Sequence, residues 1–199
     1  SKMTKALLVI DVQVDFCEGG VLACDGGAIT AKRITEHLEI NKGDYDYVIA
    51  SRDWHKANDA NDGHFAVKNE SPDFKTSWPE HCVENELGSQ YHANLDTSLI
   101  DIHIKKGQGA NGYSIFEGVD DSGTSFPNLV TDLQITQVDV VGIATDYCVF
   151  ASSMDAKKFG LAVRVITGLT AGVSQGSTEN AIDDMVDEGI EVTPVYEAN

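Results

Sequence analysis

The pattern of hydrophobic positions alternates between two kinds of segment. Short runs of consecutive apolar residues, such as 6–10, are typical of parallel strands that are buried on both faces. Between these runs, apolar residues recur at helical spacing, as Ala31, Ile34 and Leu38 do. Strands are predicted at 6–10, 47–51, 100–104, 138–142, 161–166 and 190–192. We therefore expect an α/β fold of three layers, a Rossmann-like six-stranded parallel sheet with helices on both faces.

One stretch of the chain, from about 56 to 94, follows neither pattern. It is polar, contains glycine and proline, and is rich in histidine and aromatic residues. Irregular segments of that length inside a compact domain are usually functional or disordered, and the histidine and aromatic content favours function. No repeat or linker-like segment interrupts the rest of the chain. We therefore expect a single domain over 1–199 with a functional loop insertion at about 56–94.

The chain is strongly acidic, with a formal net charge of −18 over 199 residues. Nucleic acids and anionic membranes bind basic surfaces, so neither is expected as a partner. No apolar run reaches the roughly 18–20 residues of a transmembrane helix, and we expect no signal peptide. The four cysteines form no CxxC pair, which favours reduced thiols in a cytoplasmic protein. The composition is compatible with a monomer or a homo-oligomer.

Three reactive side chains follow three of the predicted strands. Asp11 ends the first, Lys106 ends the third, and Cys148 lies in the first turn of a helix after the fourth. Because the carboxyl ends of parallel strands meet at one edge of a sheet, we expect them to converge. Together they can act as proton acceptor, electrostatic clamp and nucleophile. Taken singly, they have plainer interpretations: a turn cap, a solvated lysine and a structural cysteine.

The helix start at Cys148 has consequences for its chemistry. Asp146 is expected to cap or open this helix. A helix N-terminus offers unpaired N–H groups and a partial positive charge, which favour a thiolate and can hold an oxyanion. With Lys106 nearby as well, we expect the pKa of Cys148 to lie well below the roughly 8.5 of a free thiol.

A second group of residues suggests a metal site. Asp53 and His55 lie two apart at a strand end, so they point to the same side, and His64 and His81 follow in the irregular stretch. Imidazole and carboxylate ligands suit Zn²⁺, Fe²⁺ or Mn²⁺, and the residues alone do not choose among these ions. The alternative is a set of solvated loop histidines. Three histidines and one aspartate within so short a stretch make the loop insertion a candidate metal-binding loop.

Six short motifs along nearly the whole chain complete the pattern. They are 11–17 (DVQVDFC), 53–55 (DWH), 77–82 (SWPEHC), 106–107 (KG) with 113–114 (YS), 142–148 (GIATDYC) and 169–173 (LTAGV). In type and order, these motifs resemble those of the nicotinamidase/pyrazinamidase branch of the isochorismatase-like cysteine hydrolases. By this resemblance, Asp11, Lys106 and Cys148 are the catalytic residues. It also implies a cis peptide bond between Ile143 and Ala144, with an oxyanion hole formed by the backbone amides of Ala144 and Cys148.

The same resemblance assigns the remaining candidate site residues. It implies one divalent metal ion per chain, with Zn²⁺ favoured over Fe²⁺ or Mn²⁺, and the ligands Asp53, His55, His64 and His81. It also implies that aromatic side chains hold the substrate ring, and these are Phe16, Trp78 and Tyr113.

The function implied by the resemblance is hydrolysis of nicotinamide to nicotinate and ammonia through a cysteine thioester, within NAD salvage. Pyrazinamide is expected as a second small-molecule substrate. One alternative is a metal-independent cysteine amidohydrolase of the same superfamily that acts on a carbamoyl or ureido substrate. Another is a non-catalytic binding protein on this fold, because fold alone does not establish function.

Overall fold

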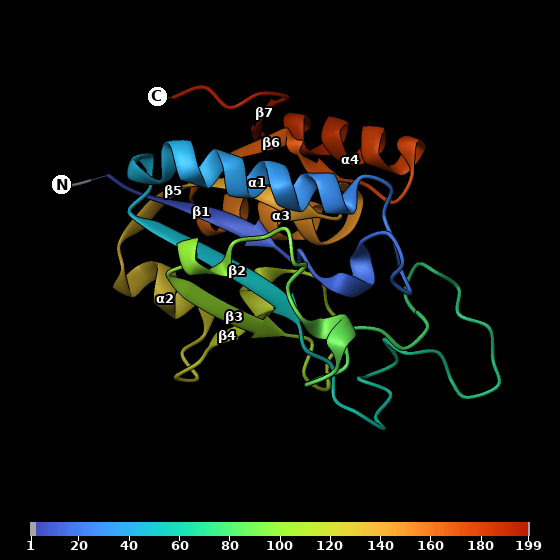
Figure 1. The fold of residues 1–199 in the computed structure, drawn as a ribbon. Helices are drawn as coiled ribbons and strands as arrows, with labels where there is room; N and C mark the ends of the chain where they lie inside the picture. Colours follow the sequence, from blue (N-terminus) through green and yellow to red (C-terminus); the bar gives the residue numbers. More distant parts are fainter. Residues whose placement is uncertain (1–2, 199) are drawn as a thin grey trace.

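The computed structural model describes residues 3–198 and contains a seven-stranded sheet between helices (Figure 1). The spatial order is β4-β3-β2-β1-β5-β6-β7, and all neighbours are parallel except β3 and β4. The strands are β1 Thr4–Ile10, β2 Tyr47–Asp53, β3 Ile102–Lys106, β4 Val119–Asp120, β5 Ile135–Ile143, β6 Ala162–Ala171 and β7 Glu191–Thr193. The predicted α/β fold is confirmed, but the predicted count of six strands is wrong. The additional strand, β4, has two residues, too few to give a periodic signal.

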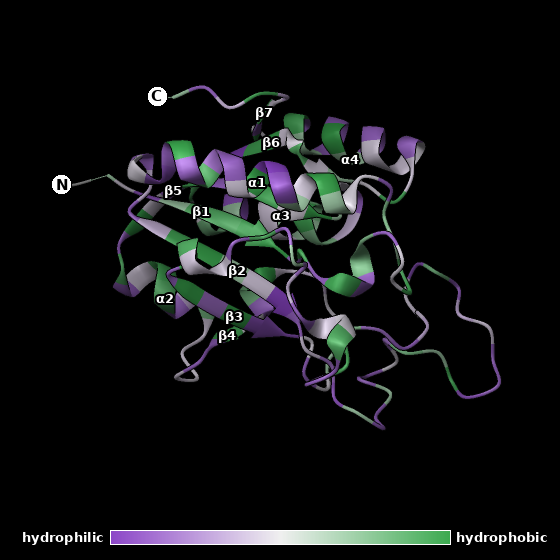
Figure 2. Cartoon of the chain, viewed as in Figure 1, coloured by the Kyte–Doolittle hydropathy of each residue, from purple (hydrophilic) through white to green (hydrophobic). Residues whose placement is uncertain are grey.

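Within residues 3–198, four α-helices cover the two faces of the sheet, and the residues of β1 pack against helices on both faces. The helices are α1 Gly27–Asn41, α2 Phe126–Asp132, α3 Phe150–Phe159 and α4 Gln175–Asp187. Leu8 and Ile10 pack with residues from α2, α3 and α4, whereas Leu7 and Val9 pack against α1. Because both faces of β1 are buried, its residues form a continuous apolar run instead of an alternating one. In Figure 2 the centre of the sheet is apolar and the helices mix polar and apolar positions.

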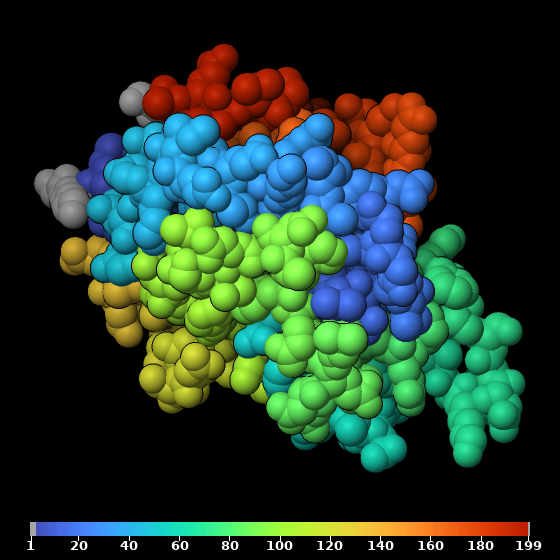
Figure 3. Space-filling model, in the orientation of Figure 1, coloured from blue at the N-terminus to red at the C-terminus, as the bar shows by residue number. Residues whose placement is uncertain are grey.

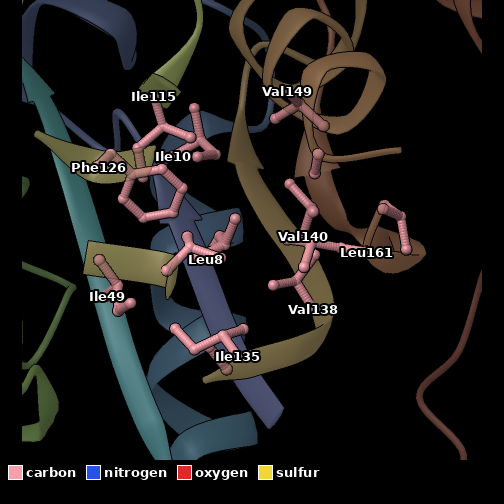
Figure 4. Close-up of a cluster of buried hydrophobic side chains, with 14 of the residues drawn as sticks. Leu8, Ile10, Ile49, Ile115, Phe126, Ile135, Val138, Val140, Val149 and Leu161 are labelled. Carbon is pink, nitrogen blue, oxygen red and sulfur yellow. The ribbon is translucent and has the colours of Figure 1, made fainter. Parts of the chain in front are cut away.

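The larger core cluster lies between the sheet and helices α2 to α4. Figure 4 shows Leu8, Ile49 and Val140 of three strands with Phe126 of α2. These four side chains are fully buried. Burying such a side chain contributes about 1.5–3 kcal/mol, so this cluster holds α2 and α3 against the strands.

The order of the strands locates a crevice in the sheet. From β1 the chain continues through α1 to β2 and β3 on one side, and later returns to β5, β6 and β7 on the other side. The order therefore reverses between β1 and β5. In open α/β sheets, ligands bind outside the carboxyl ends of the strands at such a point.

The segment between β2 and β3, residues 54–101, contains no α-helix or strand, only the short 3-10 turns Leu87–Ser89 and Thr97–Leu99. Isolated backbone bridges join His55 to Val83 and Phe65 to Trp78. Part of this segment projects from the body of the molecule as a green loop (Figures 1 and 3). No helix among residues 3–198 has the length and apolar character needed to cross a bilayer.

Candidate active site and metal centre

Four strands bring reactive side chains to the carboxyl edge of the sheet. Asp11 directly follows β1, Asp53 and Lys106 are the last residues of β2 and β3, and Cys148 lies beyond β5. All four side chains are buried, with exposed fractions between 0% and 6%. The structure therefore brings together the three residues that the sequence predicted to converge, and it adds Asp53 to them.

The Lys106 ammonium lies between two carboxylates and the thiol. Its Nζ atom is 2.8 Å from Asp11 Oδ2 and 2.5 Å from Asp53 Oδ1. The same Nζ atom lies 3.5 Å from Cys148 Sγ. Ser51 donates a hydrogen bond to the other oxygen of Asp11, at 2.7 Å. This arrangement can hold a carboxylate and a sulfur atom close together while balancing their charge.

Burial and these neighbours shift the pKa values in different directions. Burial opposes the ammonium of Lys106, but Asp11 and Asp53 raise its pKa well above the usual value. Burial also opposes the charged form of Asp53, yet Lys106 and His55 hold its pKa well below the ordinary range. For Asp11, burial outweighs the attraction of Lys106 and raises the pKa. Asp11 is therefore the better proton acceptor of the two carboxylates.

The expectation of a lowered pKa for Cys148 is wrong. Burial raises the pKa of this thiol well above its usual value, and the carboxylates of Asp11 and Asp53 add to the effect of burial while Lys106 opposes it. A helix terminus and one cation do not offset burial beside two carboxylates. The resting nucleophile is thus a thiol that needs a base to accept its proton.

The segment before Cys148 sets the position of the thiol. Gly142 has a φ of 117°, and a Cβ atom there would collide with the backbone of Ile10. The peptide bond between Ile143 and Ala144 is cis, as the family resemblance implied. One turn of π-helix, Thr145–Val149, then leads into α3. Cys148 lies in this turn, where backbone N–H groups at the start of a helix are available to a ligand.

Asp146 lies in the first turn of this helix, which is one of the two positions expected from the sequence, and it does not cap the helix. Ala144 occupies the cap position and makes no side-chain hydrogen bond. The carboxylate of Asp146 instead accepts hydrogen bonds from the backbone N–H groups of Val173 and Ser174. It thereby ties the turn that carries Cys148 to the start of α4.

Asp53 and three histidines form a second cluster, which we call the His/Asp cluster. Its members are Asp53, His55, His64 and His81, all buried, and each offers a ligand atom within 4.8 Å of the others. Asp53 Oδ2 lies 3.4 Å from His55 Nε2 and 3.8 Å from His81 Nε2. The Nε2 atoms of His64 and His81 are 3.2 Å apart. The residues that the sequence grouped as metal ligands therefore lie together.

The donor set fits a divalent metal ion. The Nδ1 atoms of the three rings each face an oxygen atom, which leaves the Nε2 atoms to face one another. The buried Nε2 of His55 makes no hydrogen bond of normal geometry with any of residues 3–198. Three imidazole nitrogens and one carboxylate are ligands that Zn²⁺, Fe²⁺ and Mn²⁺ accept.

A cavity of about 280 Å³ opens beside both clusters. Asp53, His64, His81 and Cys148 reach its wall, and so do the three aromatic residues predicted to bind a ring, Phe16, Trp78 and Tyr113. The indole N–H of Trp78 donates to Tyr113 Oη at 3.0 Å, and Tyr113 donates to the Lys75 carbonyl. These hydrogen bonds fix two aromatic walls, so the cavity suits a small, flat ligand.

The residues 5–197 match the family model described as Isochorismatase domain. The chain belongs to the isochorismatase family. A nicotinamidase/pyrazinamidase of Mycobacterium tuberculosis is 45% identical over 188 residues, covering 94% of this chain and 97% of the relative.

Solved structures of similar proteins share the fold of this isochorismatase-family chain. A crystal structure of PnC1 from L. infantum in complex with nicotinate has a TM-score of 0.77 and 32% identity, covering 96% of this chain and 93% of that one. A pyrazinamidase of Pyrococcus horikoshii in complex with zinc has a TM-score of 0.78 and 28% identity, covering 96% and 99%.

Several residues of this site escaped the sequence analysis. Tyr147 and Phe74 line the cavity, although Tyr147 directly precedes the predicted nucleophile in its motif. Gln13 is fully buried, donates to the Asp53 carbonyl and accepts from the Asp53 N–H. A glutamine two residues after Asp11, between two valines, was the available signal for it. The contact between Asp53 and Lys106 had no local signal.

Proposed function

We propose that this protein hydrolyses nicotinamide to nicotinate and ammonia, and that it accepts pyrazinamide as well. The observation that carries the proposal is the shared position of Asp53. One of its oxygens contacts Lys106, which contacts Cys148, and the other faces the histidines of the His/Asp cluster. The nucleophile and the cluster whose metal ion could bind a ring nitrogen thus face the same aromatic cavity.

The first half-reaction forms a thioester. Cys148 Sγ attacks the carboxamide carbon as Asp11 accepts the thiol proton, which the raised pKa of Asp11 favours. The backbone amides of Ala144 and Cys148 hold the oxyanion of the tetrahedral intermediate. Each such donor contributes roughly 2.7–4 kcal/mol in a comparable site. Asp11 then gives the proton to the leaving nitrogen, and ammonia departs.

The second half-reaction regenerates the thiol. A water molecule attacks the thioester carbonyl while Asp11 accepts one of its protons, and the same amides hold the second oxyanion. Collapse of this intermediate breaks the carbon–sulfur bond, and the proton on Asp11 passes to the sulfur. Throughout both steps, Lys106 keeps the carboxylate and the sulfur within reach of each other by charge.

Asp53, His55, His64 and His81 would hold the metal ion, which we propose to be Zn²⁺, one per chain. A divalent ion bound there supplies a Lewis-acidic centre for a pyridine or pyrazine nitrogen. Phe16, Trp78 and Tyr113 contact the ring faces and exclude water, because they form apolar walls of the cavity. We further propose a cytoplasmic, single-domain enzyme whose loop insertion at about 56–94 serves to bind the metal ion.

The His/Asp cluster argues against the alternative of a metal-independent carbamoyl or ureido hydrolase. Such an enzyme would have no use for three buried histidines whose Nε2 atoms converge. A non-catalytic binding protein is also disfavoured, since Asp11, Lys106 and Cys148 are all present and in contact.

Ammonia release and nicotinate formation, measured together on purified protein with nicotinamide, test the proposal. Equal amounts of both products are expected from the unmodified protein. Cys148→Ala should reduce the rate by at least about 10³-fold, the scale seen when a nucleophile is removed, while the metal content stays unchanged. Product formation by Cys148→Ala close to the unmodified rate would refute the thioester route, and no turnover by the metal-loaded unmodified protein would refute the activity itself.

A further inference from the structure

The three histidines of the His/Asp cluster are oriented by different kinds of partner. The Nδ1 atom of His55 lies 2.8 Å from the backbone oxygen of Gly107, and that of His81 lies 2.7 Å from the backbone oxygen of Pro79. The Nδ1 atom of His64 instead lies 2.9 Å from a side-chain atom, Asn111 Oδ1. His64 is thus the ligand whose outer partner can be changed by substitution.

A second contact determines which way the Asn111 amide points. Its Nδ2 atom donates to the backbone oxygen of Thr76 at 3.2 Å. A flipped amide would place its oxygen against that carbonyl, and two acceptors repel each other. Asn111 therefore presents its oxygen to His64, and only a protonated Nδ1 can donate to it. In the neutral ring, this leaves the lone pair on Nε2, which is the atom that faces His81 and Asp53.

Besides the contact with Asn111, His64 has one polar contact inside the cluster, between its Nε2 and His81 Nε2 at 3.2 Å, and several ring contacts. The ring packs against His55, with centroids 4.5 Å apart, and against Tyr113, with centroids 5.8 Å apart. Such ring contacts limit the tilt of the imidazole but do not choose between its two tautomers. A hydrogen bond to the second nitrogen makes that choice.

We propose that Asn111 is a positioning residue that fixes the tautomer and direction of His64 as a metal ligand. Asn111 also joins two segments, because Thr76 belongs to the loop that carries Trp78, one wall of the cavity. The Asn111 amide thus connects His64 of the metal site to the loop that carries Trp78. The inference rests on the proposed metal site and adds to it a residue outside the ligand set.

Zn²⁺ affinity of the metal-free protein, measured by competition with a chromophoric chelator in the absence of substrate, tests this role. Asn111→Leu has a similar size but no acceptor, so it should weaken Zn²⁺ binding by about 10- to 100-fold, the usual effect of losing an outer partner. Asn111→Asp keeps the acceptor for His64 but loses the donor to Thr76. Its Zn²⁺ affinity should stay within about threefold of that of the unmodified protein. Gln108→Leu, at an exposed position of the same segment, is the matched control and should bind as the unmodified protein does.

A second readout follows the tautomer directly. In the metal-free protein, the ¹⁵N shifts of His64 should show a protonated Nδ1, and Asn111→Leu should shift them toward a mixture of tautomers. If Asn111→Leu binds Zn²⁺ as tightly as the unmodified protein, the proposal is wrong. If Asn111→Asp binds Zn²⁺ as weakly as Asn111→Leu does, then Zn²⁺ affinity depends on the loop contact with Thr76 and not on the contact with His64. The proposal is then also wrong.

The outcome is separable from that of the proposed function. If the unmodified protein binds Zn²⁺ but does not release ammonia from nicotinamide, the activity fails and the role of Asn111 is still decided by the affinities. If the unmodified protein binds no Zn²⁺, the metal centre and the role of Asn111 both fail.

Discussion

Lys106 and Asp53 face each other on neighbouring strands, with Nζ 2.5 Å from Oδ1. The other oxygen of Asp53 points to His55 and His81. One carboxylate therefore belongs to both the cysteine site and the His/Asp cluster. A metal ion bound to it would draw negative charge away from Lys106, so occupancy of the metal centre and the electrostatics of the nucleophile are coupled.

This shared carboxylate leads to a prediction about Cys148 in the metal-free protein. The pKa of its thiol is raised by burial, with Asp11 and Asp53 adding to the effect. The rate of Cys148 alkylation, followed by mass spectrometry, should therefore rise with pH around a midpoint above that of a free thiol. Asp53→Asn should move the midpoint down, because it removes a negative charge near the sulfur. His81→Ala also disturbs the metal centre but removes no carboxylate, so it should leave the midpoint higher than Asp53→Asn does. A midpoint well below about 8.5 in the unmodified protein would contradict this account.

Asp11→Asn should separate proton transfer from metal binding. The amide keeps the size of the side chain and the neighbourhood of Ser51, but it cannot accept the thiol proton. Ammonia release should fall by about 10²- to 10⁴-fold, the range expected for loss of a general base. Zn²⁺ content, measured by elemental analysis, should remain near that of the unmodified protein. An active Asp11→Asn variant would assign the base to another group.

Chelation should loosen the segment that contributes all three histidines of the His/Asp cluster. Residues 54–101 lack regular secondary structure apart from two 3-10 turns, so metal ligation would offset part of their ordering entropy. Removal of the metal should increase the rate of hydrogen exchange in 56–94. Addition of Zn²⁺ should restore the original rate. Helix α2 packs in the core cluster that contains none of residues 54–101, so its amides are the internal control. Equal exchange in both states would mean that the loop is ordered by its own contacts.

His37 should make stability depend on pH. Its Nε2 lies 2.9 Å from Tyr45 Oη, which donates to Asp139, and its Nδ1 faces the Asn41 amide N–H. Burial is the main cause that lowers the pKa of His37 in the folded protein. The unfolded chain, with an ordinary pKa of about 6.5, then binds a proton first as pH falls, so the free energy of unfolding should decrease below about pH 6.5.

Urea denaturation at several pH values measures this contribution. His37→Gln keeps hydrogen-bonding capacity without a titrating ring, and its stability should fall less between pH 7 and 5 than that of the unmodified protein. Burial also lowers the pKa of His64, to about 4, so both proteins should be compared in the same metal state. If the free energies of unfolding of the two proteins change with pH in parallel, His37 does not contribute to the pH dependence of stability.

The sequence by itself determined the layered α/β fold and the residues that would meet in the site. Apolar runs identify buried strands because both faces of a central parallel sheet exclude water. Asp11 and Lys106 were placed correctly, because a residue at the carboxyl end of a parallel strand lies at one common edge. The grouping of the histidines followed from their short separation along the chain. Their roles in catalysis and metal binding stay predictions that the experiments above test.

Only the tertiary structure decided how these residues influence one another. The contact of Asp53 with Lys106 depends on the register between β2 and β3, which is set when both strands pack into the sheet. The direction in which the pKa of Cys148 shifts depends on burial beside two carboxylates, and burial is a property of the whole fold. Asn111 reaches His64 across 47 positions of the chain, and such a contact exists only once both loops have been packed against the same sheet edge.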